Sequence, residues 1–237
     1  MVGDAFSYIF DGANWSGSEG MLTQLGQQLL LTVTALLVAV VLALPVALVL
    51  GHLGRGGFLA INVSNVGRAI PTFAVLILLS VGPLGTNVLG PYGRAGLATL
   101  VALTLFALPP IITNTYVGMR EVDKDTVEAA KGMGMKGTQL FFAVELPLAM
   151  PLILTGLRLA LVQVWATATI AALVAGPGLG NVITAGFYRS DYGKGLAGAI
   201  VVAAVAIMLE GIAALTERLA NPMVRARRRQ TATVAVA

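Results

Sequence analysis

Five stretches of the chain are apolar for long enough to cross a membrane, and this feature restricts the possible folds more than any other. A helix needs about twenty apolar residues to cross roughly 30 Å of hydrocarbon. The stretches run near Leu22 to Leu50, Phe58 to Val81, Arg94 to Val117, Leu148 to Ala175 and Leu196 to Leu219. They are continuously apolar and lack the alternation of a membrane β-barrel. We therefore expect an all-α integral membrane protein with five, or six, transmembrane helices.

The composition agrees with a bilayer environment and excludes several other classes. Of 237 residues, 57% are hydrophobic and 11% are charged, so polar groups are too few to coat a soluble globule. Cysteine is absent, which excludes disulfides and thiolate catalysis. The single histidine, His52, has no partners in the sequence for a metal site. We expect no catalytic residue, no metal and no cofactor bound by this chain.

The distribution of the fifteen Lys and Arg residues predicts the orientation, because short cytoplasmic loops collect positive charge. Three of them, Arg94, Arg189 and Lys194, fall in the loops on one side of the membrane, and Arg68 and Arg158 lie inside spans. The other ten lie on the opposite side: Arg55, Arg120, Lys124, Lys131, Lys136, Arg218, Arg225, Arg227, Arg228 and Arg229. We expect the N-terminus outside and the C-terminus in the cytoplasm, with the basic tail near anionic lipid and no nucleic-acid partner.

The loop between the third and fourth stretches is the longest on the predicted cytoplasmic side, and it is amphipathic. Asp125 with Glu128 three residues later favours a capped helix, which Gly132 and Gly134 should end. A second short helix is expected through residues 140–142, ended by Pro147. Two short helices with small residues at their tips suit a groove on a soluble partner.

The sequence of this loop is similar to a known signature. Glu128, Ala129 and Ala130 are followed at fixed spacing by Gly134, Val144, Leu146 and Pro147. This resembles the EAA motif of bacterial ATP-binding-cassette (ABC) importer permeases, with Val in place of Ile. The segments NTYVGM at 114–119 and ATATIAALVAGPGLG at 166–180 further resemble permeases for glycine betaine, choline and related osmoprotectants. The likeness covers most of the chain between the second and fifth stretches.

The resemblance implies a type I ABC importer permease fold, similar to methionine permeases, with cytoplasmic coupling helices. It implies that the coupling loop, 118–147, docks into an ATPase through seven residues: Glu128, Ala129, Ala130, Gly132, Gly134, Leu146 and Pro147. Residues 1–20 would then form an external segment that stays on the mature chain, 21–220 the permease domain, and 221–237 a basic cytoplasmic tail.

Polar residues inside membrane spans are candidates for the translocation pathway. In the second stretch, Asn65, Arg68 and Thr72 would share one face of a helix. They either line the pathway, or Arg68 binds a buried acid such as Glu210 or carbonyls freed by Pro71. In the fourth stretch the candidates are Gln163, Trp165 and Thr169, and the Trp165 ring either contacts a quaternary ammonium or packs in the interior.

The chain has no G-x-x-x-x-G-K-[ST] phosphate-binding loop, so ATP and Mg²⁺ would be bound by a separate protein. The resemblance implies two ATPase subunits, a second permease subunit, the same or paralogous, and an extracytoplasmic substrate-binding protein. Two alternatives remain open at this stage: an ABC permease for amino acids or another small solute, and a secondary transporter or channel.

Overall fold

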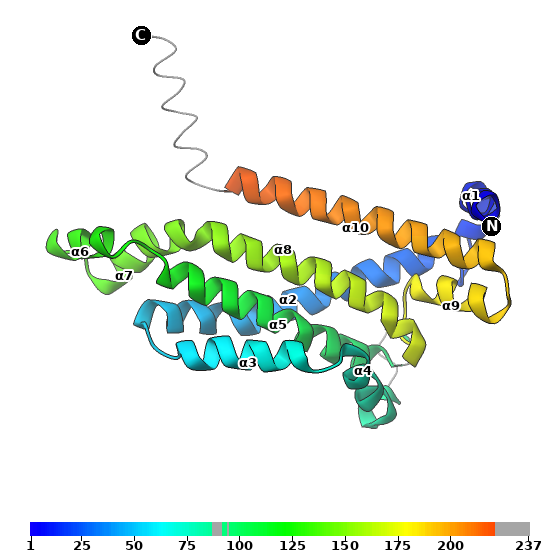
Figure 1. The fold of residues 1–237 in the computed structure, drawn as a ribbon, viewed down its shortest axis with the longest axis horizontal. Helices are drawn as coiled ribbons and strands as arrows, with labels where there is room; N and C mark the ends of the chain where they lie inside the picture. Colours follow the sequence, from blue (N-terminus) through cyan, green and yellow to red (C-terminus); the bar gives the residue numbers. More distant parts are fainter. Residues whose placement is uncertain (87–91, 94, 221–237) are drawn as a thin grey trace, which may run out of the picture. The chain divides into compact units, whose positions relative to one another are not determined.

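The computed structural model describes residues 1–86, 92, 93 and 95–220, and in this part of the chain the secondary structure is helical. Figure 1 shows the helices in chain order. They are α1 (Val2–Phe10), η1 (Gly12–Trp15), α2 (Met21–Leu53), α3 (Gly57–Ala69), α4 (Thr72–Val81), η2 (Pro83–Gly85), α5 (Gly96–Arg120), α6 (Lys124–Gly132), α7 (Gly137–Leu140), the π-helical turn η4 (Phe141–Glu145), α8 (Leu146–Ile170), η5 (Ala171–Val174), α9 (Gly180–Tyr188) and α10 (Tyr192–Ala220). The predicted basic tail, 221–237, and Arg94 lie outside the described residues.

Four of the five predicted stretches form helices that are long and apolar enough to cross a membrane. These are α2, α5, the continuous run Gly137–Val174 that contains α8, and α10. Proline does not interrupt them: Pro45 lies inside α2, and Pro109 and Pro110 lie inside α5. The predicted all-α membrane architecture is confirmed for these four spans.

The second predicted stretch, Phe58 to Val81, is not one helix. Helix α3 ends at Ala69, and α4 begins at Thr72 after an extended Pro71. Proline disfavours the helical conformation of the residue before it, here Ile70, and its ring nitrogen cannot donate a helical hydrogen bond. The expectation that Asn65, Arg68 and Thr72 share one helical face is therefore wrong, because Thr72 starts a separate helix of ten residues.

The chain folds into two compact units. Unit 1 comprises Met1–Ala39, Gly67–Ala107 and Ala160–Leu209, and unit 2 comprises Val40–Val66, Leu108–Leu159 and the residues from Glu210 onward. Each of the four long helices contributes residues to both units.

Each unit has its own apolar core. In unit 1, the ring of Trp165 packs with Met21, Leu179, Val182 and Val201, and a second cluster gathers around Leu76 and Phe106. In unit 2, Met119 in the last turn of α5 and Val122 just after this helix pack against Ala149 and Ile153 of α8. The unit 2 core therefore lies directly beneath the predicted coupling loop, which connects these two helices.

Within unit 1, α9 and α10 pack so closely that only glycine fits between them. A Cβ atom added to Gly186 of α9 would lie 2.6 Å from the Cα atom of Gly195 in α10. The backbone N–H of Asp191 donates to the carbonyl of Gly186 at 2.9 Å, which closes the turn. This tight turn fixes the relative positions of the side chains at the end of α9 and the start of α10.

We predict that Gly186→Ala destabilises the protein by about 1–3 kcal/mol, because the backbones of α9 and α10 must move apart. Thermal unfolding of the purified protein in detergent measures the effect. Gly211→Ala in α10 is the matched control, since nothing lies within 4 Å of the position of its added Cβ. Equal melting temperatures for the two variants would contradict the close packing.

Candidate functional site

The predicted coupling loop forms helix α6, and its N-cap is Asp123 rather than Asp125. The Asp123 carboxylate accepts the backbone N–H of Thr126 at 2.7 Å. Asp125 lies in the first turn of the helix. A cap residue must have a non-helical backbone and must precede the free N–H groups, and of the two acids only Asp123 does so.

The charge of this cap persists at neutral pH. The hydrogen bond from the backbone N–H of Thr126, followed by one from its side chain, lowers the pKa of the Asp123 carboxyl below its ordinary value of 3.8. A carboxyl whose pKa is lower in the folded protein contributes stability above its unfolded pKa and loses it as the pH falls through the folded value. The start of α6 is therefore stabilised at neutral pH, and it loses this stabilisation as the pH falls through the lowered pKa of Asp123.

Helix α6 presents a small and charged face to solvent. Glu128 and Ala129 are exposed, whereas Ala130 is buried. The helix ends at Gly132, and Gly134 follows with φ +86°, as predicted for the two glycines. The N–H groups of Gly134 and Met135 donate to the carbonyls of Lys131 and Ala130, the pattern of a Schellman cap. The exposed end of the loop therefore has a fixed backbone and little side-chain bulk.

The second part of the loop joins α8 without a break, contrary to the expectation that Pro147 ends a helix. Helix α7 continues through the π-turn η4 into α8, and Leu146 and Pro147 lie in the first turn of α8. The N–H of Leu146 donates to the carbonyl of Phe141, five residues earlier. A π-turn shifts each helical hydrogen bond to the carbonyl five residues earlier, so the helix can accommodate Pro147, which has no N–H group.

A hydrogen bond between two side chains, which the sequence did not suggest, lies at the base of this loop. His52, in the last turn of α2, bonds through Nδ1 to the carboxylate of Glu145, and its ring packs edge-on against Phe141. Glu145 is buried, with 10% of its side chain exposed. His52 and Glu145 also line a cavity of ≈ 250 Å³ together with Arg120, Lys131 and Glu128. Glu145 is the variable position inside the V-x-L-P part of the motif, so the motif gave no reason to select it.

The pathway candidates of α8 lie at different depths in unit 1. Trp165 is fully buried, and its indole N–H donates to the carbonyl of Val202 at 3.1 Å. The Trp165 ring therefore packs in the interior, which is the second of the two roles that the sequence left open. Thr169 and Gln163 are half-buried. Thr72 is also half-buried, and the side chains of Asn65 and Arg68 lie outside the described residues.

Gln28 of α2 forms a buried polar link that sequence reasoning missed. Its side-chain amide donates to the hydroxyl of Thr169 at 2.9 Å and to the carbonyl of Trp165 at 3.3 Å. Its Oε1 atom accepts the N–H of Leu179 at 2.9 Å. Gly178 has φ +123°, and a Cβ there would lie 2.9 Å from Gln28 Oε1, so this turn requires glycine. The GPGLG turn at 176–180 is buried, and its N–H groups at Leu179 and Gly178 bond to Gln28 and Gln24.

Unit 2 contains a charged network between α8 and α10. Arg158 donates through Nε and Nη2 to Glu210 and through Nη1 to Glu217 at 3.1 Å. The hydroxyl of Thr155 also donates to Glu217, at 2.8 Å. Glu210, which the sequence suggested as a partner for Arg68, is therefore bound to Arg158. The signal that could have found this pairing is the presence of Arg and Glu near the middle of two adjacent spans.

Comparisons with known proteins agree with this arrangement. Residues 35–221 match the family described as binding-protein-dependent transport system inner membrane component. The chain is 32% identical to the glycine betaine/carnitine/choline transport system permease protein OpuCB of Bacillus subtilis (strain 168), over 87% of this chain and 91% of the relative. It is 33% identical to the carnitine transport permease protein OpuCB of Listeria monocytogenes, over 81% and 84%.

A solved structure of the MetNI methionine ABC transporter in inward-facing conformations contains a chain of the same fold. The TM-score is 0.67 at 20% sequence identity, over 82% of this chain and 93% of that chain. At this level of identity the likeness concerns the fold alone.

We predict that Gln28→Met destabilises the protein by about 1–3 kcal/mol, because the N–H of Leu179 loses its acceptor inside the core. Thermal unfolding in detergent measures the loss. The neighbouring variant Gln27→Met is the control and should change stability by less than about 0.5 kcal/mol, since Gln27 is only half-buried. If both variants unfold at the same temperature, the Gln28 link does not stabilise unit 1.

Proposed function

Because the chain belongs to the family of binding-protein-dependent transport system inner membrane components, we propose that it is the permease of an ATP-driven importer for glycine betaine, choline, carnitine or related osmoprotectants. One observation carries the solute class: relatives about a third identical over most of both chains are permeases named for these solutes. The methionine transporter shares the fold, but at 20% identity its solute does not extend to this chain.

The proposed mechanism requires partners that supply energy and solute. The chain is a non-catalytic subunit, and a separate pair of ATPase subunits binds and hydrolyses ATP with Mg²⁺. Four long spans and the broken segment α3–α4 are too few to enclose a pathway, so a second permease subunit completes it. An extracytoplasmic binding protein delivers the solute, with the N-terminus of this chain outside and the coupling loop in the cytoplasm.

Helix α6 and the turns that follow it are proposed to transmit the motion of the ATPase. The exposed Glu128 and Ala129 dock into the ATPase, and the small side chains permit a close approach. Residues 137–174 form one continuous helical run, so a displacement at the loop reaches α8 without an intervening flexible linker. The hydrogen bond between His52 and Glu145 connects the base of the loop to α2. Movement of α6 would thereby displace two spans together.

We predict that Glu128→Arg abolishes co-purification of the ATPase subunits and reduces solute uptake at least tenfold, because a reversed charge and a larger side chain enter the docking surface. Affinity purification of the tagged permease from membranes, followed by quantification of the ATPase, measures the effect.

Glu121→Arg makes the same change of charge at an exposed residue that precedes α6, and it should retain the ATPase. Full retention of the ATPase by Glu128→Arg would contradict the docking role of α6.

We also predict that cells lacking their own osmoprotectant importers accumulate radiolabelled glycine betaine or choline when this permease is produced with its ATPase and binding protein. Growth at high osmolarity with these solutes should be restored in parallel. Substitution of the catalytic glutamate of the ATPase should abolish uptake while leaving the amount of permease unchanged. Uptake of methionine but of neither quaternary ammonium solute would contradict the proposed solute class.

A further inference from the structure

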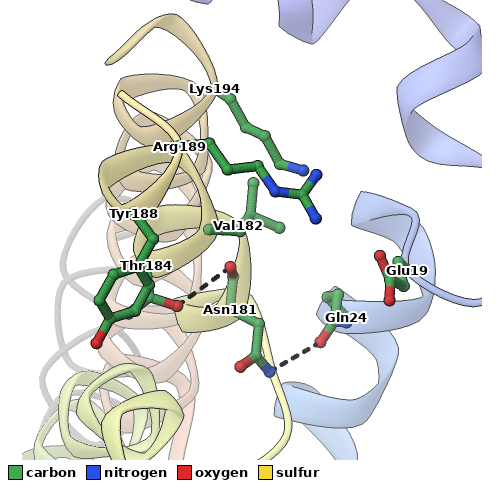
Figure 2. Close-up of a pocket in the computed structure, with 9 residues that line it drawn as sticks. Glu19, Gln24, Asn181, Val182, Thr184, Tyr188, Arg189 and Lys194 are labelled. Atoms are coloured by element: carbon green, nitrogen blue, oxygen red, sulfur yellow. Dashed lines mark hydrogen bonds between the residues drawn. The ribbon is translucent and has the colours of Figure 1, made fainter. Parts of the chain in front are cut away.

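A polar cavity in unit 1 is not explained by the proposed transport path. It has a volume of ≈ 320 Å³ and lies where three segments meet: the turn before α2, the length of α9, and the start of α10. Figure 2 shows the side chains that line it, with Glu19 and Gln24 on one side and Arg189 and Lys194 on the other.

Two cations form one wall of this cavity. Arg189 caps the C-terminal end of α9, and Lys194 lies in the first turn of α10. The glycine packing of Gly186 against Gly195 holds these two helix ends together. In Figure 2 the guanidinium of Arg189 and the ammonium of Lys194 extend in the same direction, into the cavity. The fold therefore fixes two positive charges side by side.

Neither cation is neutralised within the part of the chain that the structure describes. The ion pairs found there involve other residues, and the nearest acid in the sequence, Asp191, accepts the backbone N–H of Lys194 at 3.0 Å, not its ammonium. The ammonium of Lys194 lies 6.0 Å from the centre of the Tyr8 ring, a distance at which a cation interacts with an aromatic face. Both side chains thus keep donors available for a ligand.

The floor of the cavity adds further polar groups. Gln24 accepts through Oε1 from the N–H of Gly178 at 3.2 Å and from the amide of Asn181 at 3.4 Å. These two bonds orient the Gln24 side chain and leave its own amide N–H groups as donors at the cavity. Glu19, on the far side, is the one acid among the lining residues. The lining therefore has an excess of one positive charge and suits a ligand with a single negative charge.

A carboxylate matches this lining best. A guanidinium binds the two oxygens of a carboxylate in parallel, and an ammonium supplies a second, less directional positive charge. A phosphate would bring more than one negative charge toward Glu19. A neutral ligand would leave the excess positive charge of the lining without a counter-charge.

The carboxylate is expected to come from a protein rather than from the transported solute. Small-molecule sites bury most of their ligand, but Tyr188 at this cavity is 85% exposed, and Glu19 and Arg189 are exposed as well. Tyr188 is the single aromatic residue in the lining, and one ring cannot enclose a quaternary ammonium. The opening suits a side chain that projects from a partner surface.

We propose that Arg189 and Lys194 form a docking site for an aspartate or glutamate side chain of the solute-binding protein. The proposal rests on the proposed function, which places the start of α2 outside the cell, where the binding protein delivers solute. Gln24 donates to the incoming carboxylate from the side opposite the two cations, and Glu19 repels partners that carry further negative charge. The site would therefore select the binding protein by charge and set its orientation on the permease.

Binding of the purified solute-binding protein to the complete transporter in lipid nanodiscs tests this proposal. For Arg189→Gln and for Lys194→Gln we expect the dissociation constant to rise about tenfold each, because a charge-assisted hydrogen bond is lost. The rise of the dissociation constant with salt should be weaker in the variants than in the unaltered protein. Arg218→Gln, which removes an exposed guanidinium at the other end of α10, should leave binding unchanged.

Two further experiments, a charge exchange between the partners and a binding measurement with free solute, show whether the carboxylate comes from the binding protein or from the solute. Replacing one acid of the binding protein by Arg should restore binding to Arg189→Glu. The proposal is overturned if an Arg189→Gln, Lys194→Gln double variant binds the solute-binding protein with unchanged affinity. It is also overturned if this variant still docks the solute-binding protein but no longer binds free glycine betaine, because the site would then take the solute. Failure of the proposed function has a different signature, because the unaltered transporter would then neither bind the binding protein nor import osmoprotectant.

Discussion

A helix inside a bilayer has no water to satisfy its polar groups, and the rest of this structure depends on that constraint. Backbone groups are satisfied within each helix, so the chain becomes a set of long helices. Polar side chains within the spans must find partners on neighbouring helices. Gln28 does so with Thr169 and Leu179 in unit 1, and Arg158 does so with Glu210 and Glu217 in unit 2. These links specify which helices are neighbours, whereas apolar packing alone specifies the neighbours only weakly.

The same constraint explains why the coupling loop differs from the other connections. It has a capped helix, a Schellman end and a π-turn, so backbone hydrogen bonds fix both ends of α6 and the start of α8. A loop built in this way keeps its shape when a partner pushes on it. Its exposed residues Glu128 and Ala129 present a surface, while the bond between His52 and Glu145 ties its base to a second span. A rigid loop would allow a soluble ATPase to move helices in the membrane.

Unit 1 combines close glycine packing with charge. The contact between Gly186 and Gly195 brings two helix ends together, and the side chains that leave those ends are Arg189 and Lys194. An importer that depends on a binding protein must recognise that protein and release it again. A shallow site with a few charged groups suits such a transient contact better than a large apolar surface, because exposed charge pairs contribute little affinity but favour one orientation.

The sequence by itself determined the features that depend on residue type along the chain. Continuous apolar runs predicted the four long helices, and the glycines at 132 and 134 predicted the end of α6. The fixed spacing from Glu128 to Pro147 indicated the family. Local rules failed where two of them compete: Asp123 and Asp125 are both possible caps, and an apolar run from Phe58 to Val81 conceals the break at Pro71.

Only the tertiary structure decided which distant residues meet. The partners of Gln28 lie 137 or more positions away in the sequence, and Glu145 is 93 positions from His52, so no local pattern contains either pairing. The cavity between Glu19, Arg189 and Lys194 likewise exists only because α2, α9 and α10 converge. Hydrophobicity and backbone preference act over a few residues and are visible in a sequence, whereas pairing of buried polar groups depends on distances in space that only the packed helices set.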